Sequence, residues 1–364
     1  MVPPRPVRRL VVAPATVLLA FLMATTLPLT ALVAAFVSPR LPGRWRPLRV
    51  LWVVFAGLLL ESAALFACLV LWIASGFGWK LSEPRFQRAH EWLVREYLRT
   101  LVRTARRALN LTFELEGLHE VRAEADDEGR AHVPVLVLAR HAGPGDSILL
   151  VQGLTALRRH PRVVLKSSLQ WAPALDVVLG RIPSQFVGPG DQRGAAAAGI
   201  ARLAAGLGPD DGLVLFPEGG NFTEDRRVRS IAKLEESGEH DRAERARLMR
   251  YVLSPRPGGV LAALEAAPSA DVVFVAHTGL EDLSSIVDLW RGLPLDASIK
   301  VRIWRVPAHE IPADRRGRIS WLDGWWYLID RWILERRGEA AVPDAVIEQL
   351  VDREAGHADD DAAL

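Results

Sequence analysis

Two long apolar segments open the chain. Residues 10–37 carry no charged side chain, and residues 50–77 carry only Glu61. Each segment is longer than the roughly 20 residues that an α-helix needs to cross a bilayer. A secretory signal peptide fits less well, because its apolar region spans only about 7–15 residues and a second apolar segment follows here at once. The pattern therefore predicts two membrane helices within residues 1–80.

The charged residues do not decide how deeply these helices enter the bilayer. Glu61 lies near the middle of the second segment, where a carboxylate costs on the order of a few kcal/mol in lipid. It therefore faces a partner helix or a polar pocket, or else the segment lies shallowly. Arginines flank the apolar segments and also occupy their link, at positions 40, 44, 46 and 49. The positive-inside rule favours both ends in the cytoplasm only by a small margin, and a hairpin pressed into one leaflet explains the basic link equally well. We expect a protein of the cell membrane whose remaining chain faces the cytoplasm.

Residues 82–110 have the pattern of a basic amphipathic helix. Its apolar positions are 92, 93, 98, 101, 102 and 109, and arginines occupy many of the others. Two interpretations stand side by side. The helix either docks on a protein core or lies at the interface against anionic lipid.

From about residue 112, short apolar runs alternate with helical stretches. The runs typical of strands are 133–139, 162–166, 212–216, 271–276 and 299–305. Helical stretches are 147–158, 191–207, 240–252 and 258–266. This alternation predicts an α/β domain over residues 81–338, with a mostly parallel sheet flanked by helices. Residues 339–364 form a polar, acidic tail.

Composition and motifs exclude several classes of function. The formal net charge of +2 gives no indication of a nucleic-acid partner, and the lone Cys68 excludes an intramolecular disulfide or a cysteine-rich zinc site. The sequence contains no GxSxG, HExxH, Walker A or GxGxxG motif.

The first candidate site follows the run 133–139. His141 comes just after its end, where the active sites of parallel sheets lie. A Gly-Pro-Gly turn leads to Asp146, at the position expected for a helix N-cap. The pair is either a loop histidine with a capping aspartate, or a base oriented by a carboxylate. A tight turn of this kind would bring the carboxylate back to the imidazole.

The second candidate site is the stretch "LVLFPEGGNFTEDRRVR", residues 213–229. An apolar strand ends in Pro217, Glu218 and two glycines, and three arginines follow closely. A glycine-rich turn beside arginines is suited to a phosphate. The alternative is a plain loop before a charged surface helix.

Together the two stretches resemble a known family. "HAGPGD" (141–146) matches the His-x4-Asp pattern, and "FPEGG" (216–220) the Phe-Pro-Glu-Gly block, of the glycerolipid acyltransferase superfamily. Over residues 85–310 the chain resembles the 1-acylglycerol-3-phosphate acyltransferases. Residues 163–188 are similar to the family's intermediate block, and residues 249–260 and 325–336 to the branch of lysocardiolipin and long-chain lysophospholipid acyltransferases.

The resemblance implies an activity and roles for particular residues. A fatty acyl group would pass from coenzyme A or acyl carrier protein to a lysophospholipid hydroxyl, with 1-acylglycerol-3-phosphate as the first expected acceptor. His141 would be the general base and Asp146 its orienting partner. Glu218, Gly219, Lys166 and nearby arginines would bind the acceptor at the bilayer surface. No metal or bound cofactor is required.

The chain also departs from the family pattern. Gly220 and Asn221 stand where the family usually continues with Thr-Arg, and Pro189 replaces a frequent arginine. Arg226 and Arg229 are the first candidates to supply the missing phosphate contact, and Arg181 and Arg193 come next. The fourth family motif corresponds to residues 273–279, which include His277. Two other hypotheses stay open: a lipid-binding or scaffold protein that has kept the fold, and a lipid esterase that uses Ser147.

Overall fold

The sheet at the centre of the molecule has seven strands in the order β1-β7-β6-β2-β5-β3-β4. The computed structural model describes residues 2–41, 45–122, 133–143, 145–166, 170–181, 184–187, 193–279 and 297–339. The strands are β1 (Thr112–Glu116), β2 (Val135–Ala139), β3 (His160–Lys166), β4 (Ser184–Val187), β5 (Asp211–Leu215), β6 (Asp271–Thr278) and β7 (Ser298–Val306). Only the β6–β7 pair is antiparallel among the described pairs.

The mixed α/β architecture with a mostly parallel sheet is confirmed, and all five predicted strands are present. Two edge strands escaped prediction. In β1, exposed Glu114 and Leu115 break the buried apolar pattern, and β4 is only four residues long. Both lie at the ends of the sheet, where one side of a strand has no neighbour. The predicted acidic tail lies outside the described residues, apart from Glu339.

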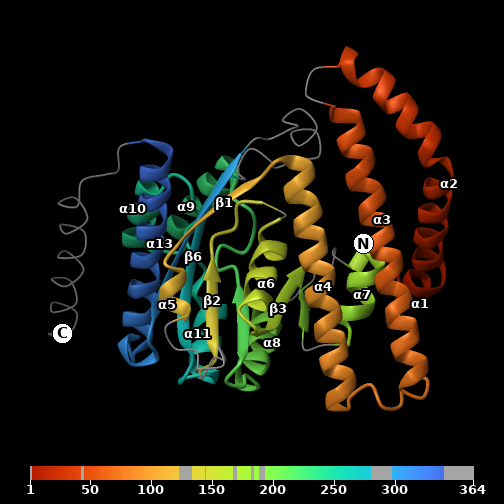
Figure 1. Ribbon diagram of the computed structural model, residues 1–364. Helices are drawn as coiled ribbons and strands as arrows, with labels where there is room; N and C mark the ends of the chain where they lie inside the picture. The colour runs from red at the N-terminus through yellow and green to blue at the C-terminus, as the bar shows by residue number, and fades with distance from the viewer. Residues whose placement is uncertain are drawn as a thin grey trace, which may run out of the picture.

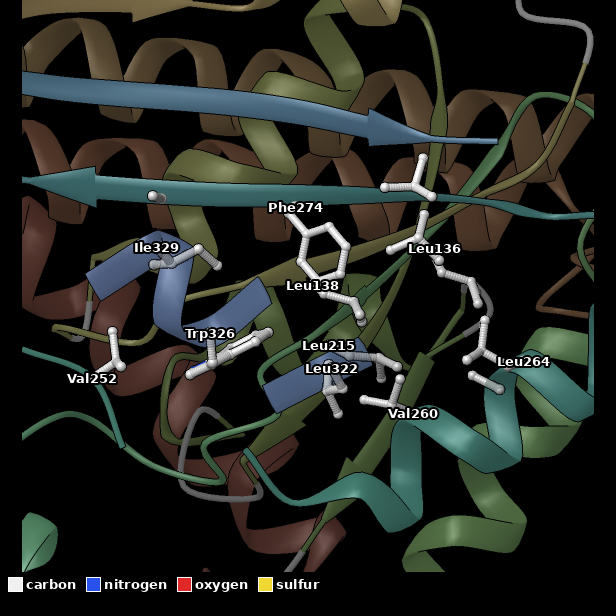
Figure 2. Packing of buried hydrophobic residues seen from close by; sticks show 14 of the residues in the cluster. Leu136, Leu138, Leu215, Val252, Val260, Leu264, Phe274, Leu322, Trp326 and Ile329 are labelled. Atoms are coloured by element: carbon white, nitrogen blue, oxygen red, sulfur yellow. The ribbon is translucent and has the colours of Figure 1, made fainter. Parts of the chain in front are cut away.

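One face of the sheet is covered by the helices of the second half of the chain (Figure 1). Alternate residues of the central strands, such as Leu136, Leu138 and Phe274, point to this face and are fully buried. The Trp325 ring stacks on Phe274 at 4.3 Å, and Trp326 packs beside it (Figure 2). The helices in this layer are α8 (Arg193–Ala205), α10 (His240–Leu248), α11 (Pro257–Ala266) and α13 (Arg315–Arg337).

The opposite face is covered by helices from the first half. Residues such as Val137 and Val273 pack here against α4 (Pro84–Leu109), α6 (Asp146–Ala156) and α7 (Pro173–Leu179). The predicted amphipathic helix is thus present as α4 and docks on the core. Trp92, expected on its apolar face, is instead 60% exposed, because the buried stripe runs through Leu93, Tyr97 and neighbouring positions.

The N-terminal segment forms a helical hairpin beside α4 (Figure 1). Its first arm is a continuous helical path through α1 (Arg5–Val7), the π-helical η1 (Arg8–Val12) and α2 (Ala13–Val37), and its second arm is α3 (Arg46–Ala74). Two helices are long and apolar enough to cross a membrane, which indicates membrane association by length and composition alone. Many side chains of α2 are exposed, whereas Ala64 and Cys68 of α3 are buried in the same cluster as the sheet.

The remaining helices are short or peripheral. They are η2 (Ser38–Arg40), α5 (Leu118–Arg122), α9 (Glu224–Glu236) and η4 (Ala308–Glu310). Of these, α9 directly follows the glycine-rich turn after β5, and Thr223 caps it by accepting a hydrogen bond from the Arg226 N–H.

Candidate active site

Three neighbouring strands bring the candidate residues together at one edge of the sheet. His141 follows β2, Glu218 follows β5, and His277 is the last residue but one of β6. Strands β6, β2 and β5 are adjacent and mutually parallel, so their carboxyl ends meet at the same edge. Ligands of open parallel sheets bind at this edge.

The turn after β2 folds Asp146 back onto His141. The Asp146 Oδ2 lies 3.0 Å from the His141 Nδ1 and accepts the N–H groups of Ala142 and Gly143, at 2.7 and 2.8 Å. The expected return of the carboxylate to the imidazole is therefore observed. Asp146 is not the N-cap, however: Gly145 occupies that position and Asp146 is the first residue of α6. Its carboxylate bonds backward into the turn instead of forward into the helix.

Asp146 is ionised in this environment. Burial opposes the charged form, but three contacts outweigh it: the nearby His277, the hydrogen bond with His141 and the N–H of Gly143. Together they hold the pKa of Asp146 well below its ordinary value. A carboxylate at His141 Nδ1 fixes the proton on that nitrogen and leaves Nε2 as the basic atom.

The other side of the His141 ring leaves Nε2 able to accept a proton. Its ring stacks on Phe216 with centroids 4.3 Å apart, and 9% of its side chain is exposed. Within the described chain, the Nε2 atom has no hydrogen-bond partner. The imidazole is therefore fixed on one side and available on the other.

Glu218 positions His141 from within the core. Its side chain is 1% exposed, its Oε1 accepts the His141 N–H at 3.0 Å, and its Oε2 accepts the Leu253 N–H at 3.1 Å. Complete burial raises the pKa of Glu218 to about 8, even though Arg140 and the two N–H groups oppose this rise. Both oxygens are thus bonded to backbone N–H groups of the protein, and a contact of Glu218 with an acceptor stays a prediction.

Arg140 and Asp330 support the site, and neither was predicted from the sequence. The buried Arg140 guanidinium donates to the carbonyls of Tyr251 and His277. Asp330 of α13 accepts the N–H groups of Arg250 and Tyr251. These bonds hold residues 249–253 in an irregular segment, and the helix predicted over 240–252 ends at Leu248. The apolar signal continued past that point, and only the distant carboxylate explains the change.

A second histidine lies beside Asp146. The Nε2 of His277 is 3.6 Å from the Asp146 Oδ2 and 3.3 Å from the Arg140 carbonyl oxygen. Because both neighbours are acceptors, this nitrogen carries the proton. Asp146 thus has a histidine on each side, one bonded and one just beyond hydrogen-bond distance.

Two arginines lie against the glycine-rich turn after β5, and this turn is itself tied to His141. Gly219 has a φ of +69°, and a side chain there would meet the Arg256 guanidinium at about 3.0 Å. At Gly220 a side chain would meet the Arg226 guanidinium at 2.6 Å. Both arginines are exposed, and the Phe222 N–H ties the same turn to the His141 carbonyl at 2.7 Å. The absence of side chains at positions 219 and 220 thus leaves room for the guanidinium groups of Arg256 and Arg226 to lie against this turn. Arg256 was not predicted as a site residue, because it lies 37 positions further along the chain.

Two of the other candidate arginines make contacts outside this turn. Arg229 donates from Nε to the Asp225 carbonyl of its own helix. Arg181 donates to the Cys68 carbonyl at 2.8 Å and contacts His90 at 2.9 Å, so it links the sheet domain to α3 and α4. The side chains of Lys166, at the end of β3, and Arg193, at the start of α8, lie outside the described part of the structure, as does Pro189.

No group of three His, Cys, Asp or Glu side chains within the described ranges is arranged to hold a metal ion. No protein-family model and no curated protein sequence matches this chain.

Proposed function

We propose that this protein is a membrane-associated O-acyltransferase of the glycerolipid acyltransferase type. It moves a fatty acyl group from acyl-CoA, or from acyl carrier protein, to the hydroxyl of a lysophospholipid, with 1-acylglycerol-3-phosphate as the first candidate acceptor. The observation that carries the proposal is the His141–Asp146 pair: Nδ1 is bonded to a buried carboxylate, and Nε2 is open at the carboxyl edge of the sheet.

The reaction follows from that geometry. The Nε2 of His141 takes the proton of the acceptor hydroxyl while the oxygen attacks the thioester carbonyl, and Asp146 stabilises the resulting imidazolium. The C–O bond forms, the tetrahedral intermediate collapses and the C–S bond breaks. His141 then returns its proton to the departing thiolate. No serine nucleophile is needed, and in the described chain His141 makes no hydrogen bond to Ser147.

The turn after β5 supplies the acceptor's head-group contact in this proposal. The Arg226 and Arg256 guanidinium groups flank the glycines beside His141 and replace the arginines that the family pattern places elsewhere. Two exposed guanidinium groups are suited to a phosphate monoester, which each can bind through paired N–H donors.

The proposed activity is tested with purified full-length protein in neutral detergent. Radiolabelled acyl-CoA is supplied with a panel of lysophospholipids that differ in head group, and labelled diacyl product is separated and counted. Transfer to 1-acylglycerol-3-phosphate supports the proposal. Labelled free fatty acid without diacyl product would indicate an esterase, and no turnover with any donor and acceptor would favour the scaffold hypothesis.

We further infer that the N-terminal hairpin enters one leaflet and does not span the bilayer. Helices α3 and α4 lie side by side along most of their length: Arg49 donates to the Ala108 carbonyl at 2.7 Å, and the Tyr97 hydroxyl donates to Glu61 at 2.5 Å. Glu61 also accepts the Ala174 N–H of α7 at 2.9 Å, which answers how α3 accommodates a carboxylate.

The charge of α4 is the reason for this inference. Its outer face exposes arginines at positions 85, 88, 99, 103, 106 and 107. If α3 crossed the hydrocarbon core, α4 would cross beside it, and each arginine near the centre would cost several kcal/mol. A hairpin that inserts through its exposed α2 face keeps these arginines at the head groups, where they favour anionic lipid.

Cysteine labelling distinguishes the two arrangements. Wild-type protein, whose one cysteine is the buried Cys68, is the unlabelled control. Arg40→Cys reports on the link of the hairpin and Arg229→Cys on the α/β domain. In sealed inside-out vesicles, an impermeant maleimide should label both variants if the hairpin stays in one leaflet. Labelling of Arg229→Cys alone would show that the hairpin spans.

A further inference from the structure

A second cationic site lies where the N-terminal helix meets the α/β domain. A cavity of about 370 Å³ lies between the start of that helix, α7 and the first residue of β4. Its lining includes Arg5, Arg8, Gln170, Asp176 and Gly180. These residues belong to other elements than the turns that carry His141 and Glu218, so this cavity, called the arginine pocket below, is separate from the candidate active site.

Arg8 is a buried residue of the arginine pocket, and two hydrogen bonds hold its side chain in place. Its side chain is only 9% exposed, and one terminal nitrogen donates to the Asp176 Oδ1 at 2.8 Å. The other terminal nitrogen donates to the Pro3 carbonyl at 2.6 Å. The buried Nε of Arg8 has no hydrogen-bond partner in the described chain. Buried guanidinium N–H groups are normally satisfied, so this donor points to a ligand oxygen.

Two further guanidinium groups converge on the same place. A side chain at position 180 would meet those of Arg5 and Arg9 at 3.4 and 3.7 Å, so Gly180 leaves the space that they occupy. Asp176, the one carboxylate in this lining, also pairs with Arg9, whose Nε lies 4.0 Å from the Asp176 Oδ2. The Arg5 side chain makes no hydrogen bond or ion pair within the described ranges. Three guanidinium groups beside one carboxylate leave a net charge of +2 at this place.

We propose that the arginine pocket binds the phosphate of an anionic phospholipid of the surrounding membrane. The chemistry that fits is a phosphate group, which guanidinium groups bind with short, charge-assisted hydrogen bonds. The pocket directly precedes the uncharged segment 10–37, so a bound phosphate would lie at head-group depth with its acyl chains along the exposed face of α2. The site goes beyond acyl transfer: it binds a lipid that is not the substrate and fixes the hairpin on the domain.

Ligand-induced thermal stabilisation of full-length protein in neutral detergent tests this proposal. The probes are dihexanoyl-phosphatidylglycerol, dihexanoyl-phosphatidylcholine and inorganic phosphate. The variant Arg5→Gln/Arg9→Gln removes two of the three positive charges and spares the hydrogen bond between Arg8 and Asp176. Arg315→Gln/Arg316→Gln removes the same charge from the exposed start of α13, which packs on the opposite face of the sheet from α4, and is the matched control. Equal melting temperatures of all three proteins without ligand show that the substitutions leave the fold intact.

We expect phosphatidylglycerol to stabilise the wild type and the control, and phosphatidylcholine to have little effect. The apparent Kd for phosphatidylglycerol should rise about tenfold or more in Arg5→Gln/Arg9→Gln. Equal stabilisation of both double variants, or none of the wild type, would overturn the proposal. If inorganic phosphate stabilised the protein at the same concentrations, the proposal that the bound phosphate belongs to a lipid would be wrong. Because the readout is stability, the result is independent of whether the protein transfers acyl groups.

Discussion

Glu218→Gln tests how the core holds His141. Both Glu218 oxygens accept a backbone N–H, from His141 and from Leu253. Glutamine has one oxygen, so its NH₂ group must face one of these N–H donors. An unsatisfied buried donor costs about 1–3 kcal/mol, and we expect the variant to lose that much stability in weak acid.

The dependence on pH gives the prediction its sharpest form. The pKa of the carboxyl is about 8 in the folded protein, because Glu218 is fully buried, against 4.5 for an ordinary glutamate. Between these values the folded chain keeps a proton that the unfolded chain has released. The contribution to stability is therefore greatest below 4.5 and falls as the pH rises to about 8. At 1.36 kcal/mol per pH unit, the loss amounts to about 5 kcal/mol.

Glutamine does not titrate, so the protein with the higher melting temperature should be the wild type at low pH and the variant at high pH. Near pH 5 the wild type should melt at the higher temperature, and at about pH 8–9 Glu218→Gln should equal or exceed it. Tryptophan fluorescence follows the melting of both proteins in neutral detergent. Glu236→Gln, on the exposed face of α9, is the control for a lost carboxylate at the surface. Parallel curves for wild type and Glu218→Gln across this range would refute the reasoning.

Two further predictions concern turnover. Asp146→Asn should lower kcat by about 10³–10⁴-fold with little change in KM, because the amide no longer fixes the imidazole tautomer. A loss of less than tenfold in steady-state assays would speak against Asp146 as the orienting group. Arg226→Ala and Arg256→Ala should each raise the acceptor KM by about tenfold and leave the donor KM unchanged. Arg229→Ala, whose side chain bonds its own helix, is the matched control, and equal effects in all three variants would contradict the assignment.

The parts of the fold that the sequence predicts are those governed by local pattern. Strands β2, β5 and β6 are buried on both faces, so their continuous apolar runs are unambiguous. The His141–Asp146 contact is also local, since a five-residue turn brings the two together. Strand β1 was not predicted because exposed Glu114 and Leu115 interrupt the buried apolar pattern at an edge of the sheet.

Long-range contacts explain what the sequence could not reveal. Arg140 reaches a carbonyl 111 positions away, and Asp330 reaches N–H groups about 80 positions away. Nothing near either residue in the sequence indicates its partner. Arginines cannot be told apart by their position in the sequence alone. Only the tertiary structure shows that Arg181 bonds to the Cys68 carbonyl, that Arg229 bonds to a carbonyl of its own helix, and that Arg226 lies against Gly220.

The most direct test of the account is acyl transfer by His141→Ala. Purified wild-type and variant protein are assayed with radiolabelled acyl-CoA and 1-acylglycerol-3-phosphate, and their melting temperatures are compared to show that both are folded. Alanine removes the base and no other side chain is assigned to take its place, so we expect turnover to fall by about 10²–10⁴-fold while the protein stays folded. A folded variant that transfers acyl groups at nearly the wild-type rate would contradict the assignment of His141 as the general base.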